Sequence, residues 1–428
     1  MENFEMNMNL SNDSEMKQHY LRFTEQLSDW YSNEKTPELA GQDTGFALKL
    51  QKEKLQSIGL DVQKQINKSK EGNDTVSSLS YSDNVFVNTN ISSDKLITTS
   101  IRNSQNEIYS RSAECGLHIV IQNPKQGGIP SPDTAMCCPH CGAPSTLGKL
   151  ESGCDYCDTK FLMDELYPKV MNFFVYERTK DYYDQKPMKK YILGFSLFFL
   201  VVCVVQMIFN AASGKIDFSR LLFEGVGYLF GSVFAGVIFG VGAWFIAGTF
   251  GTVKSIGKSA RGVGKAGKSL VFCYKMQKID PTFSTEYFRD KSVSLLKLMV
   301  YSKNPQELTV CKCDKLIPEK IREIVDVTYY NSGVDRYSIN NGVCDVSVTF
   351  YTDDLHYRDG RIYNKSDKIR MSLRKVIKKP TDLGFSVMAV TCPSCGASFD
   401  AEKVKNCPFC GNTYPIEEND WVVTDIEI

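Results

Sequence analysis

The chain has 428 residues, a length that accommodates two or three domains. Its 50 lysines and arginines balance its 50 aspartates and glutamates, so no global charge draws the protein to nucleic acid or lipid. Many of its 15 cysteines lie in two clusters of CxxC pairs, and the polar, acidic N-terminus resembles neither a signal peptide nor a transit peptide. These features exclude a secreted disulfide framework and favour bound metal in a reducing compartment.

The first part of the chain predicts an α+β domain over residues 15–135, after a disordered start at 1–14. Amphipathic patterns predict one helix near Glu15–Tyr31 and a second that carries Leu55, Ile58, Val62 and Ile66. Apolar alternation predicts strands near Asn84–Val87, Lys95–Ile101, Glu107–Arg111 and Leu117–Ile121. The stretch Lys68–Asp83 is rich in serine, asparagine and glycine, which predicts a mobile loop.

A CxxC…CxxC cluster over residues 136–165 predicts a zinc ribbon, and the same pattern recurs over 392–414. The eight ligands are Cys138, Cys141, Cys154, Cys157, Cys392, Cys395, Cys407 and Cys410. Each CxxC places two thiolates on one tight turn, and a hairpin joins two turns into a tetrahedral site. A glycine follows three of the four turns, and Asp158, which tolerates the same left-handed backbone, follows the other.

Redox pairs and rubredoxin-type iron are the alternatives to zinc at these clusters. Redox pairs do not come as matched couples eleven or twelve residues apart, so we expect two structural zinc ions. Four cysteines close the coordination sphere of each ion, which leaves no open position for catalysis. Cys137 and His140 adjoin the first cluster and are interpreted as bystanders.

Two uncharged stretches predict a membrane hairpin. After a juxtamembrane segment at 166–190, residues 191–212 and 226–250 are each long enough to cross a hydrocarbon core of about 30 Å, and a short external loop at 213–225 joins them. Neither has the polar face that a soluble helix needs. Basic side chains lie mainly outside the hairpin, so we expect an integral protein, in a bacterial cytoplasmic membrane, with both termini cytoplasmic.

The second span carries two GxxxG pairs, Gly227/Gly231 and Gly236/Gly240. Such rows of small residues let helix backbones approach closely. Packing against the first span is the simplest use of these glycines, and homo-oligomerisation is the alternative.

A basic juxtamembrane segment follows at 251–278. Its cations recur every three or four residues, on one helical face that suits anionic lipid: Lys254, Lys258, Arg261, Lys265 and Lys268. Within it, GVGKAGKS at Gly262–Ser269 spells the phosphate loop of nucleotide hydrolases. A working phosphate loop follows a buried strand, and polar, basic residues precede this one, so we expect no nucleotide site.

The last part of the chain predicts a second α+β domain over 279–391, then the second ribbon, then a closing strand within 415–428. Helices are predicted over Ser284–Val300 and Pro318–Thr328. Strands are predicted around Val346–Phe350, Ile369–Leu373 and Phe385–Thr391. Their clean alternation is typical of an antiparallel sheet with one buried face.

Matching segments indicate that the chain contains a duplication. Tyr109 precedes Cys138 by 29 residues, and Tyr363 precedes Cys392 by the same interval. Farther upstream, YSNEKTPEL at Tyr31–Leu39 matches YSKNPQEL at Tyr301–Leu308. The same order in both halves favours a repeated unit over coincidence.

Helices followed by a curved antiparallel sheet resemble the cystatin-like, nuclear-transport-factor-two-like fold. We therefore expect an α+β protein of two cystatin-like units, each with a four-cysteine zinc ribbon, separated by a two-helix transmembrane hairpin. The opening Asp280, Pro281, Phe283 and Ser284, before a long helix, is similar to the entry of the Tim-forty-four-like domain. The motifs CPHCGAP and CPSCGA around a membrane hairpin resemble the bacterial zinc-ribbon members of that family. The resemblance implies membrane association and scaffolding linked to protein translocation, and it carries over no catalytic residue.

The leading functional hypothesis is a non-enzymatic, membrane-anchored adaptor that binds an unidentified protein partner. The alternative is a ligand pocket or enzyme that uses Asp345, Tyr351, Asp353, Asp354 and His356. The simpler interpretation of these residues is an exposed strand face at Asp345 and a hairpin loop at TDDLHYRDGR. Nucleic-acid binding is not expected, because neither ribbon is basic with exposed aromatic side chains and the one basic stripe adjoins the membrane.

Overall fold

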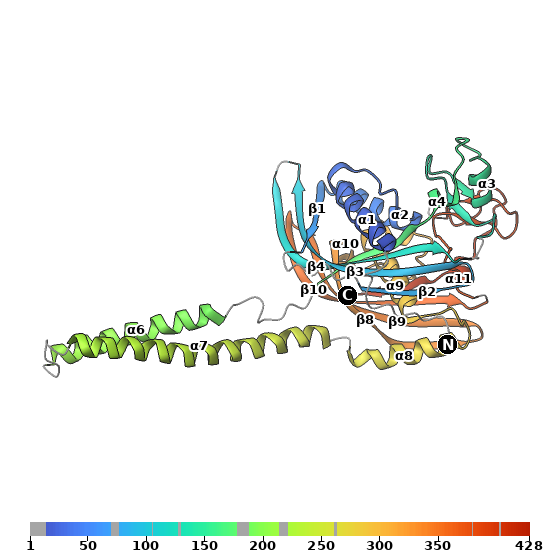
Figure 1. Ribbon diagram of the computed structural model, residues 1–428. Helices are drawn as coiled ribbons and strands as arrows, with labels where there is room; N and C mark the ends of the chain where they lie inside the picture. Colours follow the sequence, from blue (N-terminus) through green and yellow to red (C-terminus); the bar gives the residue numbers. More distant parts are fainter. Residues whose placement is uncertain are drawn as a thin grey trace. The chain divides into compact units, whose positions relative to one another are not determined.

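The computed structural model describes residues 14–69, 77–104, 106–126, 130–177, 188–213, 221–260, 263–378, 380–401 and 404–428 (Figure 1). The chain divides into two compact units, of which one combines Met1–Arg178 with Gly262–Ile428 and the other is Thr179–Arg261. The predicted disordered start, and residues 70–76 and 214–220 of the two predicted loops, lie outside the described residues. The loop predicted over Lys68–Asp83 is wrong at its end, because Ser77–Ser82 form a strand that pairs with Val87–Ser92.

The first half of the larger unit contributes two long helices and five strands of the main sheet. The elements are α1 (Ser14–Asn33), α2 (Gln42–Ser57), β1 (Leu60–Lys68), β2 (Ser77–Ser82), β3 (Phe86–Asn103), β4 (Glu107–Pro124) and β7 (Lys169–Glu177). The helix predicted through Val62 and Ile66 is wrong, because α2 ends before Gly59, whose positive φ of 71° turns the chain into β1. Val62 and Ile66 alternate along that strand and pair with Ile101 and Ile97.

The second half of the larger unit repeats this plan. Its elements are α8 (Val263–Gln277), α9 (Thr285–Tyr301), α10 (Glu319–Arg322), β8 (Ile324–Asn340), β9 (Val343–Arg358), β10 (Arg361–Val376) and β13 (Val422–Glu427). The helix predicted over Pro318–Thr328 is only α10, since β8 begins at Ile324 and pairs with β9. The predicted closing strand is confirmed as β13.

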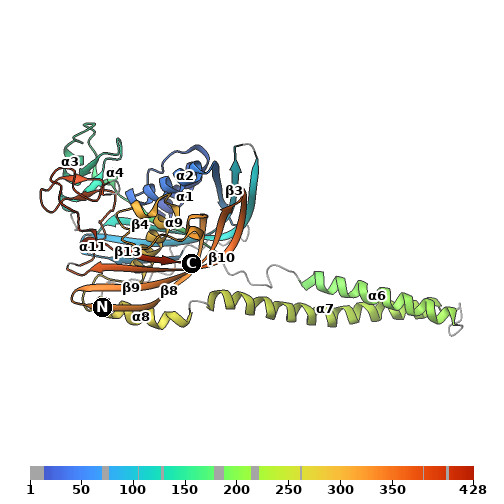
Figure 2. The same ribbon diagram turned by 180° about the vertical axis from the view of Figure 1, so that it is seen from behind.

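Strands from both halves form one nine-stranded mixed sheet, in the order β1-β3-β4-β7-β8-β9-β10-β13 with β2 beside β3. Every pair is antiparallel except β7 and β8, which join the halves in parallel at Tyr176 and Tyr329. The α+β class is confirmed, but the two expected units share one sheet rather than standing apart (Figure 2). Pairing β7 with β8 covers an edge that each half would otherwise expose.

The two halves have matching hydrogen bonds as well as matching strand order. In the first half, Val170 N donates to Leu39 O at 2.6 Å and Gly41 N donates to Val170 O at 2.8 Å. In the second half, Val423 N donates to Val310 O and Lys312 N donates to Val423 O, both at 2.7 Å. In each half the segment after the first sheet-packing helix therefore pairs with the strand that follows the ribbon. This shared geometry favours the duplication.

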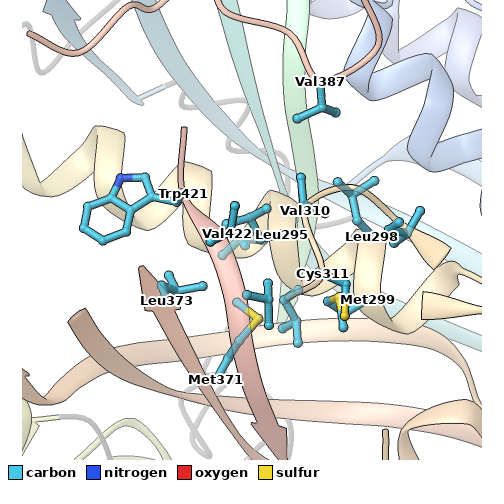
Figure 3. Close-up of a cluster of buried hydrophobic side chains, with 14 of the residues drawn as sticks. Leu295, Leu298, Met299, Val310, Cys311, Met371, Leu373, Val387, Trp421 and Val422 are labelled. Carbon is cyan, nitrogen blue, oxygen red and sulfur yellow. The ribbon is translucent and has the colours of Figure 1, made fainter. Parts of the chain in front are cut away.

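The main core lies between α9 and the strands of the second half (Figure 3). Leu295 and Met299 of α9 contact a cluster that includes Met371 and Leu373 of β10. Trp421 is fully buried at the start of β13, with its ring centroid 5.3 Å from that of Phe288. Burying such side chains stabilises the fold by about 25 cal/mol per Å² of apolar surface, so this core fixes the base of the second ribbon.

The smaller unit consists of α6 (Met188–Ala212) and α7 (Leu221–Ala260), both of which contain segments long and apolar enough to cross a membrane. The helices pack closely at two glycines: a Cβ on Gly236 would lie 2.5 Å from Ser196 Cα, and one on Gly240 would lie 2.6 Å from Ile192 Cα. Gly227 and Gly231 have nothing within 4 Å of such a Cβ. Gly236 and Gly240 thus serve packing between α6 and α7, whereas Gly227 and Gly231 have no close neighbour within the structure.

Candidate metal centres

Four tight turns of the same geometry carry the eight predicted cysteine ligands. In each turn, the residue after the second cysteine donates its N–H to the carbonyl oxygen of the first, at 2.8 Å for Gly142 and Asp158 and 2.9 Å for Gly396 and Gly411. All four donors have positive φ, including Asp158 at 58°. The prediction that aspartate tolerates this backbone is therefore confirmed.

The sulfur atoms of each ribbon form one compact group. Cys138 and Cys157 Sγ lie 3.6 Å apart and Cys141 and Cys154 Sγ lie 3.8 Å apart. In the second ribbon, the Cys392–Cys410 and Cys395–Cys407 pairs are both 3.7 Å apart. Tetrahedral sulfur ligands at 2.3 Å from an ion are about 3.8 Å apart, whereas a disulfide needs about 2.05 Å. Both groups therefore fit a metal ion, as the spacing predicts.

The pKa values of the ribbon thiols shift in both directions, and burial raises that of Cys138 to about 12. In the first ribbon, the hydrogen bond between Cys157 and Thr159 lowers the pKa of the Cys157 thiol to about 5. Among the described residues, Cys137 and His140 are not part of the four-sulfur group, but His140 forms a side-chain hydrogen bond with Cys157. Cys137 instead lines a cleft of about 640 Å³ between the first ribbon and the segment that enters α2.

The two ribbons lie side by side at one end of the sheet (Figures 1 and 2). Contacts join β12 (Ser398–Phe399) of the second ribbon to β6 (Pro144–Thr146) of the first, and β11 (Val390–Thr391) to β5 (Ala135–Cys137). Tyr156 and Phe409 occupy equivalent positions in the second turn of each ribbon and are 69% and 67% exposed. Sequence reasoning missed this aromatic pair, although CDYC and CPFC signal it.

A third cluster brings together Asp354 and His356 of β9 and Asp367 of β10. One ligand atom from each lies within 4.8 Å of the others. Asp354 and His356 were expected in a hairpin loop, but β9 extends to Arg358 and the turn is at Asp359 and Gly360. Asp367 was missed, although it occupies the buried phase of a strand that continues through Ile369 and Met371.

The other residues of the predicted polar set do not join this cluster. Asp345 pairs with Arg374 at 2.7 Å on a half-exposed surface. Lys265 Nζ lies 5.7 Å from the ring centroid of Tyr351. Asp353 accepts a hydrogen bond from Ser366 on the opposite face of β9. Strand alternation therefore separates a set that looked continuous in sequence.

Buried lysines hold the seam between the two halves. Lys64 of β1 forms an ion pair with Asp326 of β8 at 2.6 Å. Lys297 of α9 donates to the carbonyl oxygen of Phe173 at 2.8 Å and lies 3.7 Å from the centroid of its ring. Burial lowers the pKa of Lys297 to about 7, and the pKa of Lys54 likewise to about 7. The seam is thus buried and held by polar contacts.

The segment GVGKAGKS does not have the strand before it that a phosphate loop requires. The described element before it is the helix α7, and most of the segment belongs to α8. Lys265 pairs with Asp335 of β8, and Lys268 Nζ donates to the carbonyl oxygen of Asp335 at 3.2 Å. These two cations contact the sheet, while the side chains of Lys254, Lys258 and Arg261 lie outside the described part of the chain.

Comparison with known proteins found no family model, no curated protein and no solved structure that matches this chain. The resemblance to the Tim-forty-four-like domain therefore stays a prediction.

Proposed function

We propose that this protein is a membrane-anchored adaptor whose paired zinc ribbons form a docking surface for a protein partner. The observation that carries the proposal is the juxtaposition of two matched ribbons, each with an exposed aromatic ring at the same position. Exposed aromatic side chains on a rigid, metal-stapled turn are well suited to anchor a partner, because little side-chain entropy is lost on binding. Zinc is the proposed ion because four thiolates in tetrahedral geometry are typical of structural zinc.

Membrane anchoring is supported by the composition of α6 and α7. In α6, the apolar window has none of its residues buried within the structure, which suits a lipid environment. The chain segments before and after this hairpin share one hydrogen-bonded sheet. Because the halves must fold together, the hairpin has to enter and leave the membrane on one side. The basic flanks favour the cytoplasm as that side. Release by an alkaline carbonate wash would contradict the anchoring.

Contacts within the structure reduce the set of residues that are available to bind lipid or to form a homo-oligomer. Because Lys265 and Lys268 contact Asp335, binding of anionic lipid depends mainly on Lys254, Lys258 and Arg261. Because Gly236 and Gly240 pack against α6, a homo-oligomer would use Gly227 and Gly231. The proposed class of partner rests on the resemblance to the Tim-forty-four-like domain, which implies a protein of translocation or of membrane-complex assembly.

Site-specific photo-crosslinking in membranes tests the adaptor function. A photoreactive amino acid is placed at Tyr156 or Phe409, with Leu316, which is 79% exposed in the loop before α10, as the control position. We expect the same discrete adduct from positions 156 and 409, lost when zinc is chelated and absent from position 316. No adduct, or the same adducts from all three positions, would refute a ribbon-specific docking surface.

A further inference from the structure

The cluster of Asp354, His356 and Asp367 lies on the buried face of the sheet, beyond the apolar core. Along β9 the buried phase runs from Val348 and Phe350 to Asp354 and His356. Asp367 lies on the neighbouring strand, opposite Thr352 in the β9–β10 register. The exposed fractions of the three ligand-type residues are 0%, 5% and 8%, so solvent does not satisfy them.

Hydrogen bonding leaves one carboxylate oxygen in this cluster without a donor. Thr352 Oγ1 donates to Asp354 Oδ2 at 2.7 Å, and Asp354 Oδ1 is buried with no hydrogen-bond partner. His356 Nε2 lies 2.5 Å from Asp367 Oδ2. An unpaired buried carboxylate oxygen is costly, and a bound cation would remove that cost by coordinating it.

The charges around the cluster leave a deficit of positive charge. Lys365 Nζ contacts Asp367 Oδ1 at 2.5 Å from a side chain that is 56% exposed. Glu323 Oε2 lies 3.9 Å from His356 Nδ1, on the side of the ring that faces away from Asp367. A carboxylate in that place can orient a metal-bound imidazole by accepting its second N–H. Arg358 Nε lies 3.8 Å from Glu323 Oε1, so two cations that are more than half exposed, Lys365 and Arg358, face three acidic side chains.

The first half of the chain argues against a purely structural role. Aligning Tyr109 with Tyr363, and following the strand registers, matches Asp354, His356 and Asp367 with Thr99, Ile101 and Ala113. Ile101 is fully buried in the core of the first half. The sheet of the first half therefore forms with an uncharged side chain at the position that corresponds to His356. The polar set is an addition that the fold does not require.

We propose that Asp354, His356 and Asp367 form a third metal centre, which binds one divalent cation that prefers nitrogen and oxygen ligands. Its two carboxylates and one imidazole suit Mn²⁺ or Zn²⁺ and are harder than the thiolates of the ribbons. Three protein ligands leave at least one coordination position open, which the closed four-cysteine sites do not.

Manganese binding separates this centre from the ribbons, because four-thiolate sites select zinc over Mn²⁺. The full-length protein, in detergent and supplied with two equivalents of Zn²⁺, is titrated with Mn²⁺ while the electron paramagnetic resonance signal of free Mn²⁺ is recorded. We expect one Mn²⁺ per chain. Asp354→Asn and His356→Gln should each weaken binding by at least about tenfold, as loss of a ligand or its support does.

Asp345→Asn is the matched control on the same strand, because Asp345 is part of a half-exposed ion pair with Arg374. This variant should bind Mn²⁺ like the parent. Parent protein that binds no Mn²⁺ would overturn the proposal and leave the hydrogen bond between His356 and Asp367 as a purely structural contact. Equal binding by parent, Asp354→Asn and His356→Gln would overturn it as well. If one ligand variant fails to fold, the parent stoichiometry and the other variant still decide.

Discussion

The two ribbons have the same turns but differ in what supports them. Apolar and cysteine side chains of the first ribbon form a small cluster of their own, with Leu147 and Leu150 fully buried at its centre. The corresponding side chains of the second ribbon, including Phe399 and Cys407, belong to the main core that also contains Trp421. One ribbon is thus a satellite of the fold, and the other is continuous with its core.

This difference shows that one metal-binding motif can have two structural roles. The free energy of metal binding is also free energy of folding, on the order of 10 kcal/mol for a structural zinc site. Where the ribbon has its own small core, that energy orders the ribbon alone. Where the ribbon shares the main core, part of the free energy of metal binding stabilises the whole larger unit.

The largest expected effect comes from replacing one cysteine ligand in each ribbon. Cys407→Ser should lower the free energy of unfolding of the larger unit by about 3–5 kcal/mol, because the main core loses its anchor at the second ribbon. Cys154→Ser, at an equally buried cysteine, should unfold the first ribbon only. Hydrogen exchange of the amides of β10 and β13, compared between the two variants, measures the stability of the larger unit. Equal loss of protection in the two variants would contradict the difference between the ribbons.

Truncating one apolar residue near each ribbon should give a contrast of similar size without touching the metal ligands. Trp421→Ala should cost about 3–5 kcal/mol in global stability, since it leaves a cavity in the main core beside Phe288. Leu150→Ala should cost about 2–4 kcal/mol within the first ribbon and leave the global transition unchanged. Thermal unfolding in detergent, combined with zinc release, distinguishes them. A global shift caused by Leu150→Ala would argue against a satellite ribbon.

The seam between the halves should be sensitive to pH through Lys297. Its folded pKa is about 7, below the ordinary value of 10.5, so between these values the unfolded chain binds more protons. The free energy of unfolding therefore rises with pH from about 7 toward 10.5. Lys297→Met removes this contribution and should stabilise the protein at pH 7 by on the order of 1–4 kcal/mol.

Unfolding of Lys297→Met and of the parent between pH 6 and pH 10 tests this expectation. The advantage of the variant should shrink as pH rises, because deprotonating Lys297 on folding costs less as the pH approaches its unfolded pKa of 10.5. A constant difference at all pH values would show that Lys297 is not buried as described. Lys378→Met, at a half-exposed lysine that pairs with Glu418, is the control, with little change expected.

The smallest effect should come from the turns. Gly411→Ala places a side chain at a φ of 74° and should cost about 1–2 kcal/mol. Asp158→Gly, at the equivalent turn of the first ribbon, should change stability by less than about 1 kcal/mol, because aspartate already tolerates that backbone. The midpoint of zinc release under competition with a chelator reports both. A larger loss for Asp158→Gly would show that its side chain stabilises the first ribbon.

The sequence by itself determined the features that depend on neighbours along the chain. Cysteine spacing predicted both four-sulfur groups, because each turn is built within a few residues. Uninterrupted apolar composition predicted the two long helices α6 and α7. Alternation predicted β9, β10 and β13, where one strand face is buried and the other is wet.

Only the tertiary structure decided how distant segments meet. Pairing of β7 with β8 merges two expected units into one sheet, and no local pattern encodes a contact between residues as far apart as Tyr176 and Tyr329. Val62 and Ile66 fit a helical and a strand period equally well until β3 supplies their partners. Asp367 joins Asp354 and His356 only because the register of β9 and β10 places them together. Hydrogen bonds and burial across strands select these contacts, and both depend on the whole sheet.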